Sequence, residues 1–154
     1  MHSLKAFMYV ALACVVSAPM TATAEMDATC GNAPSSIAVR VHGVRSDHGY
    51  VTFVLYGDNP DEFLVKGKKL LKERFPPRTG TVEFCVAAPE PGIYAAVAYH
   101  DENGNKKFDK NWIGLPIEGF GVSNNPDYWV VPSHSDAAFK VQNGATRIDI
   151  RLRY

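Results

Sequence analysis

The sequence has no excess of charge of either sign. Its 154 residues include 16 Lys and Arg side chains and 16 Asp and Glu side chains, so the formal net charge at pH 7 is zero. Nucleic acids and anionic membranes both select for concentrated positive charge. The balance therefore argues against either as the main partner. The one basic cluster, at residues 66–74, is expected to be the solvated face of a helix or loop.

Long apolar runs are also scarce. The run at residues 6–16 is shorter than the roughly 20 residues that a membrane-spanning helix needs, so we expect no integral membrane protein. Lys5 precedes this run, and Ala22-Thr23-Ala24 provides the small residues that a signal peptidase requires. This order is typical of a cleaved secretory signal. We therefore predict a signal peptide over residues 1–24 and a mature protein that is periplasmic or secreted.

Cysteine is rare, with three in the chain. Signal cleavage would remove Cys14, and lipidation there is disfavoured because Ala11, three positions earlier, is not a large aliphatic residue. Cys30 and Cys85 would then lie in an oxidising compartment, which predicts one disulfide. Alternation around Cys85 places its side chain away from the apolar face of its strand. The bridge should therefore tether residues 25–35 across the back of a sheet.

The sequence lacks motifs for nucleophilic catalysis and for transition-metal binding. Its histidines share no metal-ligand spacing with each other or with cysteine. Ser123 lies in Gly-Val-Ser-Asn-Asn, which lacks the closing glycine of a nucleophile elbow and the expected strand and helix around it. We therefore assign no catalytic residue.

The chain does contain repeated period-2 alternation, which indicates half-buried strands. The clearest stretches are residues 37–41 and 148–152, where Ile, Val and Leu alternate with other residues. Further candidates are residues 50–56, 81–87, 93–100, 128–131 and 137–142. Asn143-Gly144 predicts a tight hairpin. About seven short strands at this spacing predict an all-β fold, an antiparallel β-sandwich over residues 36–154.

Residues 61–75 depart from this alternation. Apolar residues recur there among lysines at roughly helical spacing, although Gly67 weakens a helix by about 1 kcal/mol relative to alanine. We expect a short helix or an ordered crossover loop that packs on the edge of the sandwich.

An apolar run at residues 95–99 ends in a loop rich in Asp and Asn. Oxygen ligands fall at alternate positions of this loop, a spacing that suits Ca²⁺. They are the side chains of Asp101, Asn103, Asn105 and Asp109 and the main-chain carbonyl of Lys107. Lys106 and Trp112 occupy the positions where an EF-hand needs glycine and a bidentate glutamate, so any calcium would bind weakly. A turn in which these side chains cap their own backbone needs no metal.

Residues 111–126 follow, rich in Gly, Pro and Asn but with aromatic residues among them. Long ordered loops are usually functional. We expect a ligand to bind where this loop meets the end of the preceding strand. The candidate contact residues are His100, Asp101, Trp112, Glu118, Phe120, Ser123 and Asn124.

Two stretches together carry a family resemblance. They are Gly-Ile-Tyr-Ala-Ala-Val-Ala-Tyr-His-Asp-Glu-Asn-Gly-Asn at residues 92–105, continuing to Asp109, and Gly-Leu-Pro-Ile-Glu-Gly-Phe-Gly-Val-Ser-Asn-Asn at residues 114–125. With this combination the chain resembles the DUF2141 family of secreted bacterial proteins over roughly residues 36–153. The resemblance implies a small exported domain with an immunoglobulin-like or transthyretin-like sandwich. It implies no activity, because the family is uncharacterised.

We therefore predict an exported, non-enzymatic binding module for a protein or small-molecule ligand. We expect this module to have no cofactor, or to bind calcium weakly. One alternative is a small periplasmic hydrolase-like enzyme with a pocket around His100, Asp101 and Glu118. Another is a purely structural module without a ligand.

Overall fold

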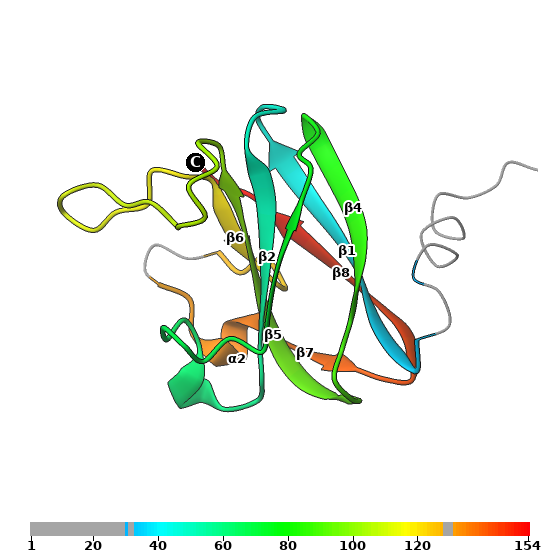
Figure 1. Cartoon of the computed structure of the whole chain (residues 1–154). Coiled ribbons are helices and arrows are strands. Elements are labelled where there is room, and N and C mark those ends of the chain that lie inside the picture. Colours follow the sequence, from blue (N-terminus) through cyan, green and yellow to red (C-terminus); the bar gives the residue numbers. More distant parts are fainter. Residues whose placement is uncertain (1–29, 31–32, 128–130) are drawn as a thin grey trace, which may run out of the picture.

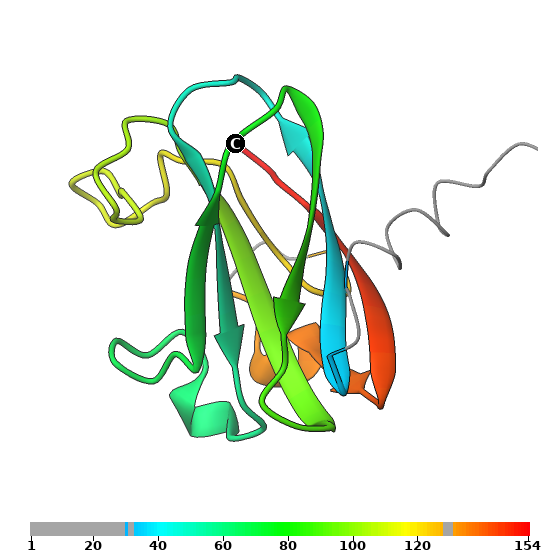
Figure 2. The ribbon, with the colours of Figure 1, turned by 45° about the vertical axis from the view of Figure 1, so that its right-hand side comes forward.

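The computed structural model describes residue 30 and residues 33–127 and 131–154. The predicted signal peptide, most of the predicted tethered segment and most of the candidate strand at 128–131 lie outside the described residues. Within the described ranges, eight strands form two sheets, which lie face to face in two layers (Figures 1 and 2). The all-β prediction is confirmed.

The three-stranded sheet has the order β4-β1-β8. Its strands are β1 (Ser35–Val44), β4 (Gly80–Ala87) and β8 (Gly144–Arg151). β1 pairs antiparallel with β4 but parallel with β8. The prediction of a purely antiparallel fold is therefore wrong. Alternation identifies a strand, but it does not show which strand lies beside it or whether the two run parallel or antiparallel.

The five-stranded sheet has the order β3-β2-β5-β6, and β7 also pairs with β5. Its strands are β2 (Tyr50–Tyr56), β3 (Leu71–Phe75), β5 (Gly92–Asp101), β6 (Phe120–Val122) and β7 (Ala138–Val141). Every pairing in this sheet is antiparallel. β5 is the longest of these strands and contacts three others, so it positions most of what surrounds it.

The prediction of a short helix or crossover loop at residues 61–75 is only partly right. A single 3₁₀ turn, η1 (Pro60–Glu62), begins the segment, and edge strand β3 ends it. Leu71 and Phe75 pack on the core, whereas Lys72 and Arg74 alternate with them on the other side. Charged side chains are common on edge strands, where they discourage pairing with other chains. The charged side chains of this edge strand are therefore the reason why its alternation was not recognised as that of a strand.

The predicted hairpin at Asn143-Gly144 is also wrong. β7, which follows the short helix α2 (His134–Ala137), pairs with β5, whereas β8 pairs with β1. The chain thus crosses from one sheet to the other at this point. Gly144 has a φ of 86°, which explains why glycine stands in this turn.

A single apolar core lies between the sheets. Alternate side chains of β1 meet alternate side chains of β2 and β5 there, as the period of 2 requires. Phe84 of β4 stacks on Phe75 of β3 with the ring centres 3.7 Å apart, and packs edge-on against Phe53 of β2 at 5.6 Å. These rings join the two sheets directly.

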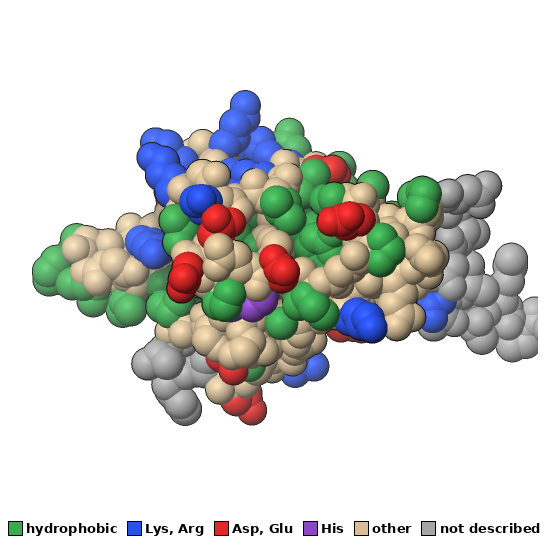
Figure 3. All heavy atoms as spheres, turned by 90° about the horizontal axis from the view of Figure 1, so that it is seen from below, with side chains coloured by type: hydrophobic (Ala, Val, Ile, Leu, Met, Phe, Trp, Pro, Cys, Tyr) green, Lys and Arg blue, Asp and Glu red, His purple; other side chains and the backbone are tan. Residues whose placement is uncertain are grey.

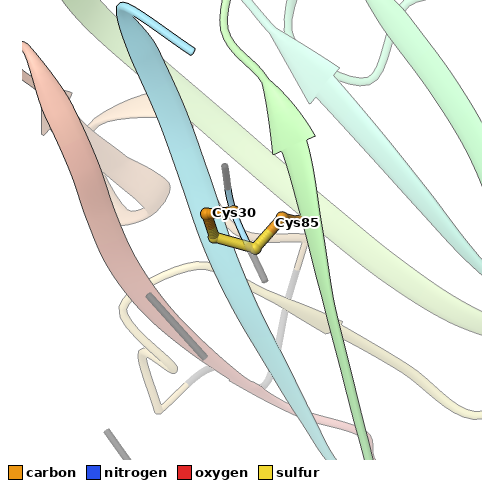
Figure 4. The surroundings of a disulfide bond; sticks show 2 residues. All are labelled: Cys30 and Cys85. Carbon is orange, nitrogen blue, oxygen red and sulfur yellow. A yellow bond between two sulfur atoms is a disulfide. The ribbon is translucent and has the colours of Figure 1, made fainter. Parts of the chain in front are cut away.

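The predicted disulfide is present and lies outside this core. Cys30 is bonded to Cys85 of β4, with Cα atoms 5.1 Å apart, and packs against Ala38 on the outer face of β1 (Figure 4). The bridge closes a loop with a sequence separation of 55 residues. It therefore fastens Cys30 to the back of the three-stranded sheet, as alternation predicted.

Replacing both cysteines with serine should lower the free energy of unfolding by about 2–4 kcal/mol, because the unfolded chain loses a long-loop constraint. Urea unfolding of the double variant C30S/C85S measures this loss. Reductant should cause the same loss in the native protein and none in the variant. Equal midpoints for oxidised native protein and variant would contradict the prediction.

Candidate functional site

The outer face of the five-stranded sheet carries a second apolar cluster. Along β5, Ala96 and Ala98 face the core between the sheets, whereas Ala95 and Tyr99 face outward. Outward side chains of β2 and β6 join them, and Phe108 and Phe120 pack against the group. This face is therefore apolar on the side where a sheet often meets solvent.

A hollow of about 820 Å³ lies on this face, and we call it the outer groove. Its floor is formed by Val54, Val97, Tyr99 and Val122 of three adjacent strands. Phe108, Leu115 and Pro116 of the β5–β6 loop line one part of it. Lys66, Lys69 and Lys110 supply its cationic groups. The groove is thus mainly apolar with lysines among its lining residues.

The loop between β5 and β6 protrudes from the body of the molecule (Figures 1 and 3). Hydrophobic side chains gather toward its far end, where Ile113, Leu115 and Ile117 are each more than half exposed. Trp112, a predicted ligand contact, is 95% exposed and is not among the residues that line the groove. Phe120, another predicted contact, does line it.

Two buried carboxylates lie near each other at one end of this outer face. The β5–β6 register pairs Tyr99 with Phe120, and the His100 N–H donates to the Gly119 carbonyl at 2.8 Å. Asp101 and Glu118 follow and precede this bonded pair, and the charge of Asp101 acts on Glu118, so the two carboxylates lie near each other. Their exposed fractions are 0% and 5%. Sequence reasoning named both residues, and the fold brings them together.

Each carboxylate has hydrogen bonds on one of its oxygens. Asp101 Oδ2 accepts from Arg74 Nη2 at 2.9 Å and from the Lys106 main-chain N–H at 2.8 Å. Glu118 Oε2 accepts from the Asp109 N–H at 3.1 Å. Burial raises the pKa of Glu118, and the negative charges of Asp101 and Asp109 raise it further.

The other oxygens of this pair have no partner. Asp101 Oδ1 and Glu118 Oε1 are buried without a hydrogen bond, as are Arg74 Nε and Thr52 Oγ1. Thr52 and Arg74 are paired across β2 and β3 on the outer face. Four of the five such atoms among the described residues therefore belong to this one region. Sequence reasoning missed both residues: the strand of Arg74, β3, was not recognised, and the strand of Thr52 was recognised without its pairing to β3.

The predicted calcium loop forms a self-capped turn. Asn103 Oδ1 accepts from the Asn105 N–H at 3.0 Å, and Asn105 Oδ1 accepts from the Lys107 N–H at 2.8 Å. Both side-chain amides also donate to Asp109 Oδ2. No group of three or more His, Cys, Asp or Glu in the described part of the chain is arranged to hold a metal. A calcium site on the predicted ligands stays a prediction.

His100 lies on the opposite side of β5 from Asp101. Its ring is buried, with Nδ1 2.8 Å from the Tyr154 hydroxyl and Nε2 2.8 Å from the His48 carbonyl. Adjacent residues of a strand point to opposite faces. The structure therefore does not bring His100 into one pocket with Asp101 and Glu118.

Ser123 and Asn124 have structural partners. Ser123 Oγ donates to the Ala137 carbonyl at 2.5 Å and accepts from the Ala96 N–H at 3.0 Å. The Asn124 amide donates to main-chain carbonyls on either side of Ala137. These bonds attach the end of β6 to β5 and α2, and neither residue lines the outer groove.

Glycines flank Phe120 because the end of the chain packs closely behind β6. A Cβ atom on Gly121 would lie 2.2 Å from the Arg151 carbonyl oxygen, and one on Gly119 would lie 2.3 Å from the Tyr154 ring. Because both neighbours of Phe120 lack a side chain, β6 can pack against the end of the chain while Phe120 faces the groove.

Comparison with known proteins identifies the family of the chain. A family model described as an uncharacterized protein conserved in bacteria, DUF2141, matches residues 39–149. The chain belongs to the DUF2141 family. The DUF2141 match spans the outer groove and the Asp101–Glu118 pair. No curated protein and no solved structure matches the chain. Among the described residues, no helix has the length and apolar character needed to cross a membrane.

Proposed function

We propose that the protein is an exported, non-enzymatic binding module with an immunoglobulin-like or transthyretin-like sandwich. Its ligand is an amphipathic molecule with an apolar chain and an anionic group, bound in the outer groove. The observation that carries this proposal is the apolar hollow with its lysines. Export is supported by the signal pattern at residues 1–24.

The size and lining of the groove suit such a molecule. Its volume of about 820 Å³ falls within the roughly 300–1,000 Å³ typical of small-molecule sites. Each methylene group buried on its floor contributes about 0.8 kcal/mol. The floor residues come from paired strands, so the site is held by a rigid sheet rather than by loops alone.

The cationic groups supply the preference for an anion. Lys66, Lys69 and Lys110 all line the groove, although the chain as a whole has no net charge. Lys72 also lies nearby, with its Nζ 5.8 Å from the centre of the Tyr99 ring. The groove-lining residues include no carboxylate or histidine within the described ranges. Such a lining favours binding over acid–base catalysis.

Palmitate should bind to the native protein, and reversing the charge of all three groove lysines should weaken binding about tenfold. This estimate assumes about 0.5 kcal/mol for each exposed lysine. Isothermal titration below the micelle concentration measures the affinities of the native protein and of K66E/K69E/K110E. The matched control is Lys140→Glu, an exposed lysine on β7 that does not line the groove.

Two further comparisons locate the ligand. Hexadecanol has the same chain length without the charge, so the triple variant should bind it about as well as the native protein does. Val97→Trp places a large side chain on the floor of the groove, so it should weaken the binding of both palmitate and hexadecanol. The proposal fails if native protein binds no palmitate, or if the triple variant and the Lys140→Glu control bind it equally.

A further inference from the structure

We propose that Asp101 and Glu118 together hold a divalent cation of the Ca²⁺ type at the base of the β5–β6 loop. This site shares only Asp101 with the calcium loop that the sequence predicts. It also does not depend on the ligand proposed for the outer groove. The reasons are the closeness of the two carboxylates, their unpartnered oxygens and the local charge.

The end of the β5–β6 pairing brings two negative charges close together. Like charges that lie close together on neighbouring strands are destabilising. The His100–Gly119 hydrogen bond shows that this pairing extends beyond β6 toward Asp101 and Glu118. Both carboxylates are also almost completely buried. A bound cation would turn this repulsion into two attractive contacts.

The hydrogen bonds leave one oxygen of each carboxylate available. Asp101 uses Oδ2 for Arg74 and a main-chain N–H, and Glu118 uses Oε2 for a main-chain N–H. Asp101 Oδ1 and Glu118 Oε1 are buried and unpartnered. Buried polar atoms without partners are rare in native proteins, and a water or an ion usually explains them. Ca²⁺ takes carboxylate and carbonyl oxygens and water as ligands.

The charges around the pair favour a divalent ion. Arg74 pairs with Asp101, and Arg45 pairs with Glu102. Two further carboxylates are near: Glu118 interacts with Asp101 and Glu102, and also with Asp109. Four carboxylates against two guanidinium groups leave an excess of two negative charges. The lysines of this region, Lys72, Lys106, Lys107 and Lys110, are exposed, so solvent and salt screen them.

Such an ion would join both ends of the β5–β6 loop. Asp101 ends β5, and Glu118 lies two residues before β6. The loop between them contributes Phe108, Leu115 and Pro116 to the outer groove. The cation would therefore hold one part of the groove lining against the sheet.

Calcium should raise the unfolding temperature of the native protein by about 5 °C or more. The estimate compares 10 mM CaCl₂ with chelator, for a site of about 10⁻⁴–10⁻³ M. Differential scanning calorimetry on the mature chain measures the shift. Mg²⁺ at the same concentration should give a smaller one, because it requires near-ideal octahedral geometry. No shift with Ca²⁺, or a larger shift with Mg²⁺, would overturn the proposal.

Two variants decide which residues bind the ion. Glu118→Gln keeps an acceptor for the Asp109 N–H but removes the charge, so it should unfold in chelator at or above the native temperature and lose the calcium shift. Asn103→Ala should retain the shift, because Asn103 is not a ligand in this proposal. The reverse pattern would place the ion in the 101–109 loop and reject the Asp101–Glu118 site. Palmitate binding in chelator is a separate measurement, so either proposal can fail alone.

Discussion

Replacing Arg74 with glutamine should lower the free energy of unfolding by about 3–5 kcal/mol, the usual cost of breaking a buried ion pair. Arg74 Nη2 lies 2.9 Å from Asp101 Oδ2, and the Asp101 side chain is fully buried. The same guanidinium group lies over the Tyr50 ring, with Cζ 3.9 Å from the ring centre. Without it, the charge of Asp101 would remain buried near that of Glu118.

Urea unfolding in chelator measures this effect, and Arg40→Gln is the matched control. Arg40 pairs with Glu83 on the surface, where the side chains are 26% and 41% exposed, so its loss should cost no more than about 1 kcal/mol. Adding Asp101→Asn to Arg74→Gln should recover part of the loss, because no uncompensated charge then remains. Equal losses for Arg74→Gln and Arg40→Gln would show that burial does not govern this pair.

Replacing Phe84 with alanine should lower the free energy of unfolding by about 3–5 kcal/mol, through lost transfer energy and a cavity between the sheets. Phe84 contacts the rings of both Phe53 and Phe75, which belong to two strands of the facing sheet. Its removal also takes away the stacking partner of edge strand β3. Chemical unfolding measures the loss, and hydrogen exchange should show reduced protection of β3.

Phe84→Leu provides the control for this prediction. It keeps most of the apolar volume, so it should cost less than about 1.5 kcal/mol. A loss below about 1 kcal/mol for Phe84→Ala would mean that the two sheets do not depend on this contact.

Most of the described strands could be predicted from periodicity, and the two missed strands have physical explanations. β3 carries lysine and arginine on its outer side, because it is an edge strand. β6 has three residues, one of them a glycine, which is too short for alternation to show. Periodicity also placed Cys85 correctly outside the core, because a strand side chain can take only one of two faces.

The candidate site was only partly predictable. Asp101, Glu118 and Phe120 stood out as polar or aromatic residues near Gly-rich turns. Thr52 and Arg74 gave no such signal, since nothing local relates them to residues about 25 to 65 positions later. They meet the others only through the pairing of β3 with β2 and of β2 with β5.

The sequence by itself determined the strand character of the chain, the single disulfide and the face that most side chains take. These properties are local, because they follow from a period of two and from the two cysteines that remain after the predicted signal cleavage. Only the tertiary structure decided which strands are neighbours, and hence that β8 runs parallel to β1 and that Glu118 lies near Asp101. Strand pairing depends on contacts between distant parts of the chain, and many pairings are compatible with the same alternation. The site around Asp101 and Glu118 exists only because these strands pair.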